Sequence, residues 1–261
     1  MSEPVHGRPG GVRLDVDGAV ATVTLDRPPR NAQVPSTWLA LAAVPDALPD
    51  DVRVVVLEAT GPAFSAGLDL GLMRAGAVDG EPSAADLAAD PQLEERIASF
   101  QAGFTWWAEH PAISIARVRG PAVGAGFQLA LATDLRVVDT SAVFAMKEVT
   151  LGLVPDLGGT RRLAELVGPS TALELVATGR SVKAAEASTL GLVDRLVGPE
   201  QLDAEVRALV DSLLATPAAA LVAVKGLMTG IGGRTRAEQL LAERSSQVPL
   251  LRALVARSPS A

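Results

Sequence analysis

The chain has 261 residues, of which 48% are hydrophobic, 20% are charged and only 3% are aromatic, so it can bury a sizeable core of small aliphatic side chains. The net charge is −7 and no basic stretch is long enough to follow a phosphate backbone, which argues against nucleic acid as a partner. Cysteine is absent and there are only two histidines, His6 and His110, so disulfides, thiolate catalysis and a Cys- or His-rich metal site are excluded, and we expect no metal.

The first elements form a hairpin followed by a helix and a strand. Met1–Gly11 is polar and lacks an apolar signal-peptide core, and no apolar run reaches membrane-spanning length, so we expect a cytoplasmic protein without a membrane partner. Val12–Asp17 and Ala19–Leu25 alternate apolar and polar residues around a tight turn, which predicts a β-hairpin. Thr37–Leu48 is expected to form a short helix, and the continuous apolar run Val52–Leu57 predicts a strand buried on both faces.

The rest of the chain alternates strands and helices. Gly71–Pro91 is rich in Ala, Gly, Asp and Pro and is predicted to be a mobile surface segment, whereas Leu93–Glu109 has helical spacing. Further strands are predicted at Ile113–Val118, Leu135–Val138, Val143–Ala145 and Val193–Val197. Further helices are predicted at Gly124–Ala132, Gly158–Val167, Ser170–Ala177, Val182–Leu190, Gln201–Ala215, Ala218–Met228 and Thr235–Val255. This order indicates α/β layering with a helical C-terminal region.

Two segments of small residues each join a strand to a helix. The first is Phe64-Ser65-Ala66-Gly67-Leu68-Asp69-Leu70, and the second is Gly120-Pro121-Ala122-Val123-Gly124-Ala125-Gly126-Phe127-Gln128. Small residues let a ligand approach the backbone, and the unpaired N–H groups at a helix start favour negative charge. Taken separately, each segment is better explained as an ordinary turn with Gly for geometry. The second segment lacks the third Gly of a dinucleotide fingerprint.

Together, in this order and at this separation, the two segments resemble the enoyl-CoA hydratase/isomerase (crotonase) superfamily. The resemblance covers nearly the whole chain. It extends to Leu25-Asp26-Arg27-Pro28 with Asn31-Ala32, to Phe144-Ala145-Met146-Lys147-Glu148 and to Leu151-Gly152-Leu153-Val154-Pro155-Asp156-Leu157-Gly158-Gly159-Thr160. Independent segments therefore agree on the same family.

The resemblance implies a spiral of ββα repeats over residues 1–200 and a helical C-terminal oligomerisation region over residues 201–261. The implied assembly is a homotrimer or a dimer of trimers. The backbone N–H groups of Leu68 and Ala125 would form an oxyanion hole for the thioester oxygen of an acyl-CoA substrate. The second position is usually Gly in the family, so Ala125 requires a backbone conformation that Ala can adopt.

The resemblance also implies how CoA is held. The binding residues would be Arg27, Arg30, Ala66, Asp69 and Lys225, with Lys225 reaching a neighbouring subunit's ligand. The alternative for each basic residue is an ordinary solvated charge. Coenzyme A would be part of the substrate, and no separate cofactor is expected.

Three positions bear on the reaction. A hydratase of this family uses two Glu residues to hold and deprotonate water, and the matching positions here are Gln128 and Glu148. Gln128 can hydrogen-bond but cannot act as a base, whereas Glu148 can transfer a proton. Asp156 lies where some isomerases of the superfamily place an acidic residue and where aryl-CoA dehalogenases place their nucleophile. Its structural alternative is an N-cap for the helix after Leu157.

We therefore expect isomerisation of an unsaturated acyl-CoA through an enolate, with Glu148, aided by Asp156, moving the proton. Three alternatives remain open: hydration of a 2-enoyl-CoA, nucleophilic attack by Asp156 on an aryl-CoA, and acyl-CoA binding without catalysis. The aryl-CoA reaction would need an aromatic-lined pocket, for which the candidates are Phe64, Trp106, Trp107 and Phe127.

Overall fold

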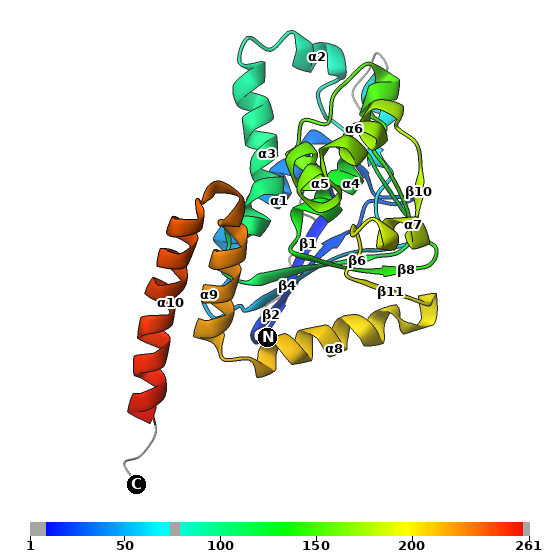
Figure 1. The fold of residues 1–261 in the computed structure, drawn as a ribbon. Helices are drawn as coiled ribbons and strands as arrows, with labels where there is room; N and C mark the ends of the chain where they lie inside the picture. Colours follow the sequence, from blue (N-terminus) through cyan, green and yellow to red (C-terminus); the bar gives the residue numbers. More distant parts are fainter. Residues whose placement is uncertain (1–8, 74–78, 258–261) are drawn as a thin grey trace.

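A computed structural model describes residues 9–73 and 79–257. Its centre is a six-stranded sheet in the order β1-β2-β4-β6-β8-β11, shown in Figure 1. The strands are β1 (Val12–Asp17), β2 (Val20–Leu25), β4 (Val54–Ala59), β6 (Ile113–Val118), β8 (Leu135–Asp139) and β11 (Arg195–Val197). Within this six-stranded sheet, β1 and β2 pair antiparallel, as the predicted hairpin requires, and the other neighbouring strands pair parallel.

Both faces of this sheet are buried, which explains the continuous apolar run of its central strand. Along β4, Val54 and Val56 join the apolar cluster beneath α8 (Leu202–Ala215), while Val55 and Leu57 join the main core. This alternation follows the period of two of a strand. Figure 1 shows α8 lying along one side of the sheet, opposite the layer that contains α4, α5 and α6.

The main core is closed by helices on the other face. These are α1 (Pro35–Ala42), α3 (Leu93–Glu109), α4 (Ala125–Ala132), α5 (Gly159–Val167), α6 (Pro169–Thr178) and α7 (Ala184–Thr189). Helix α4 is almost wholly buried, so its N-terminus is fixed by packing on every side. Trp106 and Trp107 stack at 4.0 Å and are buried, as are Phe64 and Phe127, so all four lie in the core.

Two small sheets bring the chemistry-bearing segments together. One pairs β3 (Ala32–Gln33) with β5 (Gly67–Leu68), and the other has the order β10-β9-β7, formed by Val182–Lys183, Val143–Ala145 and Pro121–Val123. A parallel bridge between Ser65 and Ala122 connects the two. The predicted helix Val182–Leu190 is thus wrong at its start, because its first two residues pair with β9.

The segment Gly71–Pro91 is only partly described, since residues 74–78 lie outside the described residues. The remainder contains a short helix, α2 (Ala84–Ala88), whose N-terminus is capped by Ser83 and Asp86 in a capping box. The spacing Ser83-Ala84-Ala85-Asp86 is the sequence signal for that cap.

The C-terminal helices α9 (Ala218–Thr229) and α10 (Arg236–Arg257) follow α8. Figure 1 shows α10 extending away from the sheet beside α9. Arg53 donates to the carbonyl groups of Leu213, Leu214 and Thr216, and so joins the end of α8 to the start of β4. The division at residue 200 stays a prediction.

Candidate active site

The two small-residue segments lie against each other. The N–H of Ser65 donates to the Pro121 carbonyl at 3.0 Å, and the N–H of Val123 donates back to the Ser65 carbonyl at 3.0 Å. Gly67 has a φ of +82°, and a Cβ there would collide with the Val123 carbonyl oxygen and lie 3.5 Å from the Ala125 nitrogen. Only glycine fits this approach, which brings the strand that ends at Leu68 next to the start of α4.

Ala125 is the first residue of α4, and its conformation is one that alanine adopts readily. The positive φ required at this turn is taken by the preceding residue, Gly124, at 51°. No side chain caps the N-terminus of α4. Because the first N–H groups of a helix have no intrahelical partner, they are suited to bind developing negative charge. The substitution of Ala for the family's usual Gly is therefore compatible with an amide donor at Ala125.

Glu148 lies directly beside these amides. It opens a 3₁₀-helix (Glu148–Leu151), and a Cβ on Gly124 would lie 3.3 Å from its Oε1 and 3.7 Å from its Oε2. Oε1 accepts from Gln128 Nε2 at 2.7 Å. Oε2 is buried and has no hydrogen-bond partner among the described residues. Burial raises the pKa of Glu148 above its ordinary value, which suits a group that must both take up and release a proton.

Gln128 fixes Glu148 to the neighbouring loop. While its Nε2 donates to Glu148, its Oε1 accepts from the N–H groups of Leu157 at 3.0 Å and Gly159 at 3.2 Å. The three contacts define which end of the amide is oxygen. The side chain is 1% exposed, so it is enclosed. Gln128 was predicted among the catalytic residues, and its contacts are those of a residue that orients Glu148.

Asp156 lies on the loop between Glu148 and α5. Its backbone carbonyl accepts from Gln101 Nε2 on α3 at 2.6 Å, a contact between residues 55 positions apart that no local motif indicates. The N-cap of α5 is Gly158 without a side-chain cap bond, so Asp156 does not take the capping role considered as its alternative. Partial desolvation raises the pKa of Asp156, and its charge adds to the raised pKa of Glu148. The two carboxyl groups therefore influence each other's protonation.

A cavity of about 510 Å³ runs along α3 on the same side as Gln101. Its lining residues are Leu93, Glu94, Ile97, Ala98 and Gln101. One of these lining residues, Gln101, is the one whose Nε2 donates to the backbone carbonyl of Asp156.

The predicted CoA-binding residues are arranged in two ways. The N–H of Ala66 donates to the Arg30 carbonyl at 2.9 Å, so these two backbones adjoin and the Arg30 side chain is exposed. Arg27 instead donates to Asp69 Oδ2 at 2.7 Å and to Asp79 Oδ2 at 2.9 Å. Against the effect of burial, the hydrogen bonds to Asp69 and Asp79 raise the pKa of Arg27. Against the effect of burial, the N–H of Gly71 and then the bond from Arg27 lower the pKa of Asp69.

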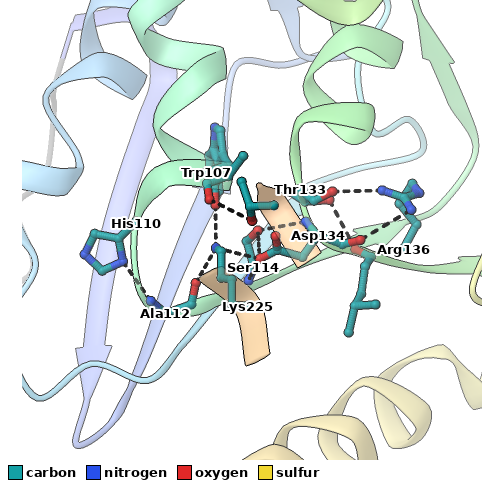
Figure 2. A network of polar contacts seen from close by, with 11 residues as sticks. Trp107, His110, Ala112, Ser114, Thr133, Asp134, Arg136 and Lys225 are labelled. Carbon is teal, nitrogen blue, oxygen red and sulfur yellow. Dashed lines mark hydrogen bonds and ion pairs between the residues drawn. The ribbon is translucent and has the colours of Figure 1, made fainter. Parts of the chain in front are cut away.

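The structure places Lys225 in the interior of the chain. Figure 2 shows its ammonium group enclosed below α3, where Nζ donates to the carbonyls of Trp107 and Ala112 at 2.7 Å and to Asp134 Oδ2 at 2.8 Å. Lys225 is 6% exposed and burial lowers its pKa. Its three N–H groups meet three acceptors inside the chain, so the side chain joins α9 to the core. The expected contact with a neighbouring subunit's CoA stays a prediction.

Comparisons with known proteins agree on one family. Residues 15–253 match the family model for enoyl-CoA hydratase/isomerase. A Mycobacterium tuberculosis protein named "Probable enoyl-CoA hydratase EchA17" is 33% identical over 239 residues, covering 91% of this chain and 87% of that protein. A carnitinyl-CoA dehydratase from Salmonella typhi is 36% identical over 228 residues, covering 86% and 80%.

Solved structures share the fold at higher identity. The crystal structure of a candidate enoyl-CoA hydratase from Thermobifida fusca is 48% identical, with a TM-score of 0.90 and 95% of each chain covered. Thermobifida fusca structures so described, in complex with CoA and with acetoacetyl-CoA, each give a TM-score of 0.88.

Proposed function

We propose that this chain, which belongs to the enoyl-CoA hydratase/isomerase family and has the crotonase fold, moves the double bond of an unsaturated acyl-CoA thioester. Family membership makes it an acyl-CoA-processing enzyme. We infer which of the family's reactions it catalyses from the residues of the site. CoA is part of the substrate.

One observation supports isomerisation most strongly. Glu148 is held through one oxygen by an amide, and its other oxygen is buried without a partner among the described residues. A buried carboxylate oxygen needs a partner, and a group on the substrate or a water molecule in the occupied site can supply it. Gln128 occupies the position where a hydratase would need its second carboxylate, and an amide does not take up a proton at ordinary pH.

The proposed reaction needs one base and two amides. Glu148 Oε2 removes a proton from C2 of a 3-enoyl thioester, and the electron pair moves onto the thioester oxygen. The N–H groups of Leu68 and Ala125 donate to that oxygen, and each such donor lowers the barrier by about 3 kcal/mol. The enolate then collapses as the proton is returned to C4, which gives the 2-enoyl thioester. The proton taken from C2 balances the one delivered to C4.

Asp156 is proposed as the second carboxyl group of the site. Its pKa is raised, so a fraction of it remains protonated at a higher pH than an ordinary Asp. A protonated Asp156 can deliver the proton to C4 while Glu148 serves as the base at C2. Asp156→Asn should therefore slow isomerisation less than Glu148→Gln, since Glu148 alone can still carry the proton between the two carbons.

Hydration of a 2-enoyl-CoA is the second candidate, favoured by the names of the relatives. The two curated relatives compared above are named as a hydratase and a dehydratase. The test is a direct comparison on one enzyme preparation, with 3-enoyl-CoA and crotonyl-CoA thioesters separated by chromatography. Isomerisation should be the faster reaction by at least about tenfold, and hydration at an equal or higher rate would overturn the proposal.

We also propose that the chain assembles as a trimer through its C-terminal helices. Large apolar side chains on α9 and α10 are strongly exposed in the single chain: Val222, Val224, Met228, Leu240, Leu241, Val248, Leu251, Leu254 and Val255. Such a surface on one helical pair is typical of a protein interface. Sedimentation should give about three times the chain mass of 26.8 kDa, or a multiple of that trimer, and a monomer at micromolar concentration would contradict it.

A further inference from the structure

The guanidinium group of Arg27 connects two short strands. Its Nη1 donates to the Ala32 carbonyl at 2.9 Å and to Asp69 Oδ2 at 2.7 Å. Ala32 belongs to β3, and Asp69 directly follows the last residue of β5. The side chain is 18% exposed, so these contacts are shielded from water. Arg27 therefore holds the end of β5 against β3 from the side.

Asp69 is bound on each of its polar sides. Its Oδ1 accepts from the N–H of Gly71 at 2.9 Å, and its own N–H donates to the Gln33 carbonyl at 2.8 Å. Together with the bond from Arg27, these contacts fix the residue in direction as well as position. Asp69 directly follows Leu68, whose N–H is one of the two proposed donors to the thioester oxygen.

The β3–β5 ladder is too short to fix that donor by itself. Its register comprises two pairs, Ala32 with Gly67 and Gln33 with Leu68. A two-stranded ladder of this length has little stability of its own. A donor to a developing oxyanion, however, has to be held within a fraction of an ångström of its productive geometry. Side-chain contacts at the end of the ladder are therefore needed, and Arg27 and Asp69 supply them.

The surrounding charges argue against a phosphate at Arg27. Its guanidinium, with one positive charge, faces the two carboxylates of Asp69 and Asp79, at 2.7 and 2.9 Å. The cluster therefore carries a net charge of −1, which repels a CoA phosphate. Arg30, whose side chain is exposed, is the better candidate for that contact.

We propose that the Arg27–Asp69 pair is a positioning device that aims the Leu68 N–H at the thioester oxygen, and that Arg27 is not a ligand for the phosphates of CoA. The inference rests on the proposed function in one respect only, the use of Leu68 as an oxyanion donor. Neither side chain touches the reacting atoms, so both are positioning residues.

Kinetics with two thioesters separate positioning from phosphate binding. Acyl-pantetheine esters carry the thioester but lack the nucleotide phosphates. Arg27→Met and Asp69→Asn should lower kcat about tenfold to a hundredfold on both thioesters, because a displaced donor weakens the chemical step. The KM for the CoA ester should change little, and the double variant should lose no more than the worse single variant. Arg27→Lys, which keeps the positive charge and places its donor N–H groups on a single nitrogen, should recover part of the loss.

Asp79→Asn and Arg30→Met are the matched controls. Asp79 also binds Arg27 but its side chain is 76% exposed, so Asp79→Asn should leave kcat unchanged. Arg30→Met should raise KM for the CoA ester alone. The proposal is overturned if Arg27→Met weakens use of the CoA ester while turnover of acyl-pantetheine stays at the wild-type rate.

A measurement without turnover distinguishes this inference from the isomerase proposal. Acetoacetyl-CoA is a β-ketothioester whose enolate absorbs in the near ultraviolet, and an oxyanion hole favours that form. Asp69→Asn should bind the ester yet show a weaker enolate band than the wild type. If the wild-type enzyme isomerises no enoyl thioester but this loss is seen, the positioning role stands and the isomerase proposal fails. An unchanged band in a folded Asp69→Asn variant refutes the positioning role.

Discussion

Replacing Gln128 with Glu tests the contact on which the proposed reaction depends. The change is isosteric and turns an amide donor, 2.7 Å from Glu148 Oε1, into a carboxylate oxygen. Two unit charges at 2.7 Å repel by about 6 kcal/mol at an effective dielectric of 20, and by about 4 kcal/mol if they relax to 4 Å. Repulsion of this size corresponds to roughly three to four pKa units, so the two carboxyl groups cannot be ionised at the same time at neutral pH.

The pair should therefore share one proton, as coupled carboxyl groups do. Below the upper apparent pKa of the pair, the shared O–H replaces the amide N–H, and isomerisation should stay within about tenfold of the wild-type rate. Above it, repulsion displaces Glu148 and the rate should fall. The acid next to a carboxylate also supplies both groups that water addition requires, so hydration of crotonyl-CoA should rise.

The assay is the pH profile of kcat/KM for both reactions in wild type and Gln128→Glu. We expect the variant to show an additional alkaline limb from the carboxyl pair, beyond any limb that loss of the Asp156 proton gives in the wild type, since the wild-type amide at position 128 does not titrate. A variant profile that overlays the wild type for both reactions would mean that residues 128 and 148 do not interact in the working enzyme, and the reasoning would be refuted.

Three further predictions concern the base, the glycine approach and the buried lysine. Glu148→Gln should lower kcat by about 10²- to 10⁴-fold with thioester binding kept. Because burial raises the pKa of Glu148, the charged side chain destabilises the wild type at a pH above this raised pKa, and the variant should have the higher melting temperature there. The difference in melting temperature should vanish at a pH below the ordinary carboxyl pKa, where Glu148 is protonated in the folded and unfolded states. Gly67→Ala should destabilise the fold by about 1–3 kcal/mol and abolish turnover, while Gly61→Ala, also at positive φ but without a close contact, should cost less in urea unfolding. Lys225→Met should cost about 3 kcal/mol in urea unfolding, because Asp134 loses its cation.

The larger elements could be read from the sequence because their burial is periodic. Leu93–Glu109 and Ile113–Val118 have the predicted bounds, since one apolar stripe and one continuous apolar run mark them without ambiguity. The sequence does not predict β3, β5 and β7, because their residues lie within turn-like segments, whereas the apolar residues Val143–Ala145 of β9 stand out. Val182 was assigned to a helix because the Ala-rich residues after it favour one, and pairing with Phe144 overrides that preference.

The candidate site was predictable where the family pattern is local, and not where it depends on distant pairing. Glu148 and Gln128 could be named from the motif, whereas their contact, across 20 residues, required the fold. The resemblance to the family implies CoA binding by Lys225 and Arg27. Their carboxylate partners lie 91 and 42 residues away, and a single sequence does not reveal such pairs.

The central claim is that the thioester oxygen accepts from the N–H groups of Leu68 and Ala125 while Glu148 Oε2 faces the acyl carbons. A crystal structure of the protein with an unreactive acyl-CoA analogue tests it most directly. We predict an oxygen about 2.7–3.2 Å from both backbone nitrogens, with the acyl chain passing Oε2. A thioester oxygen beyond hydrogen-bond distance of both nitrogens, with the analogue fully bound, would contradict the account.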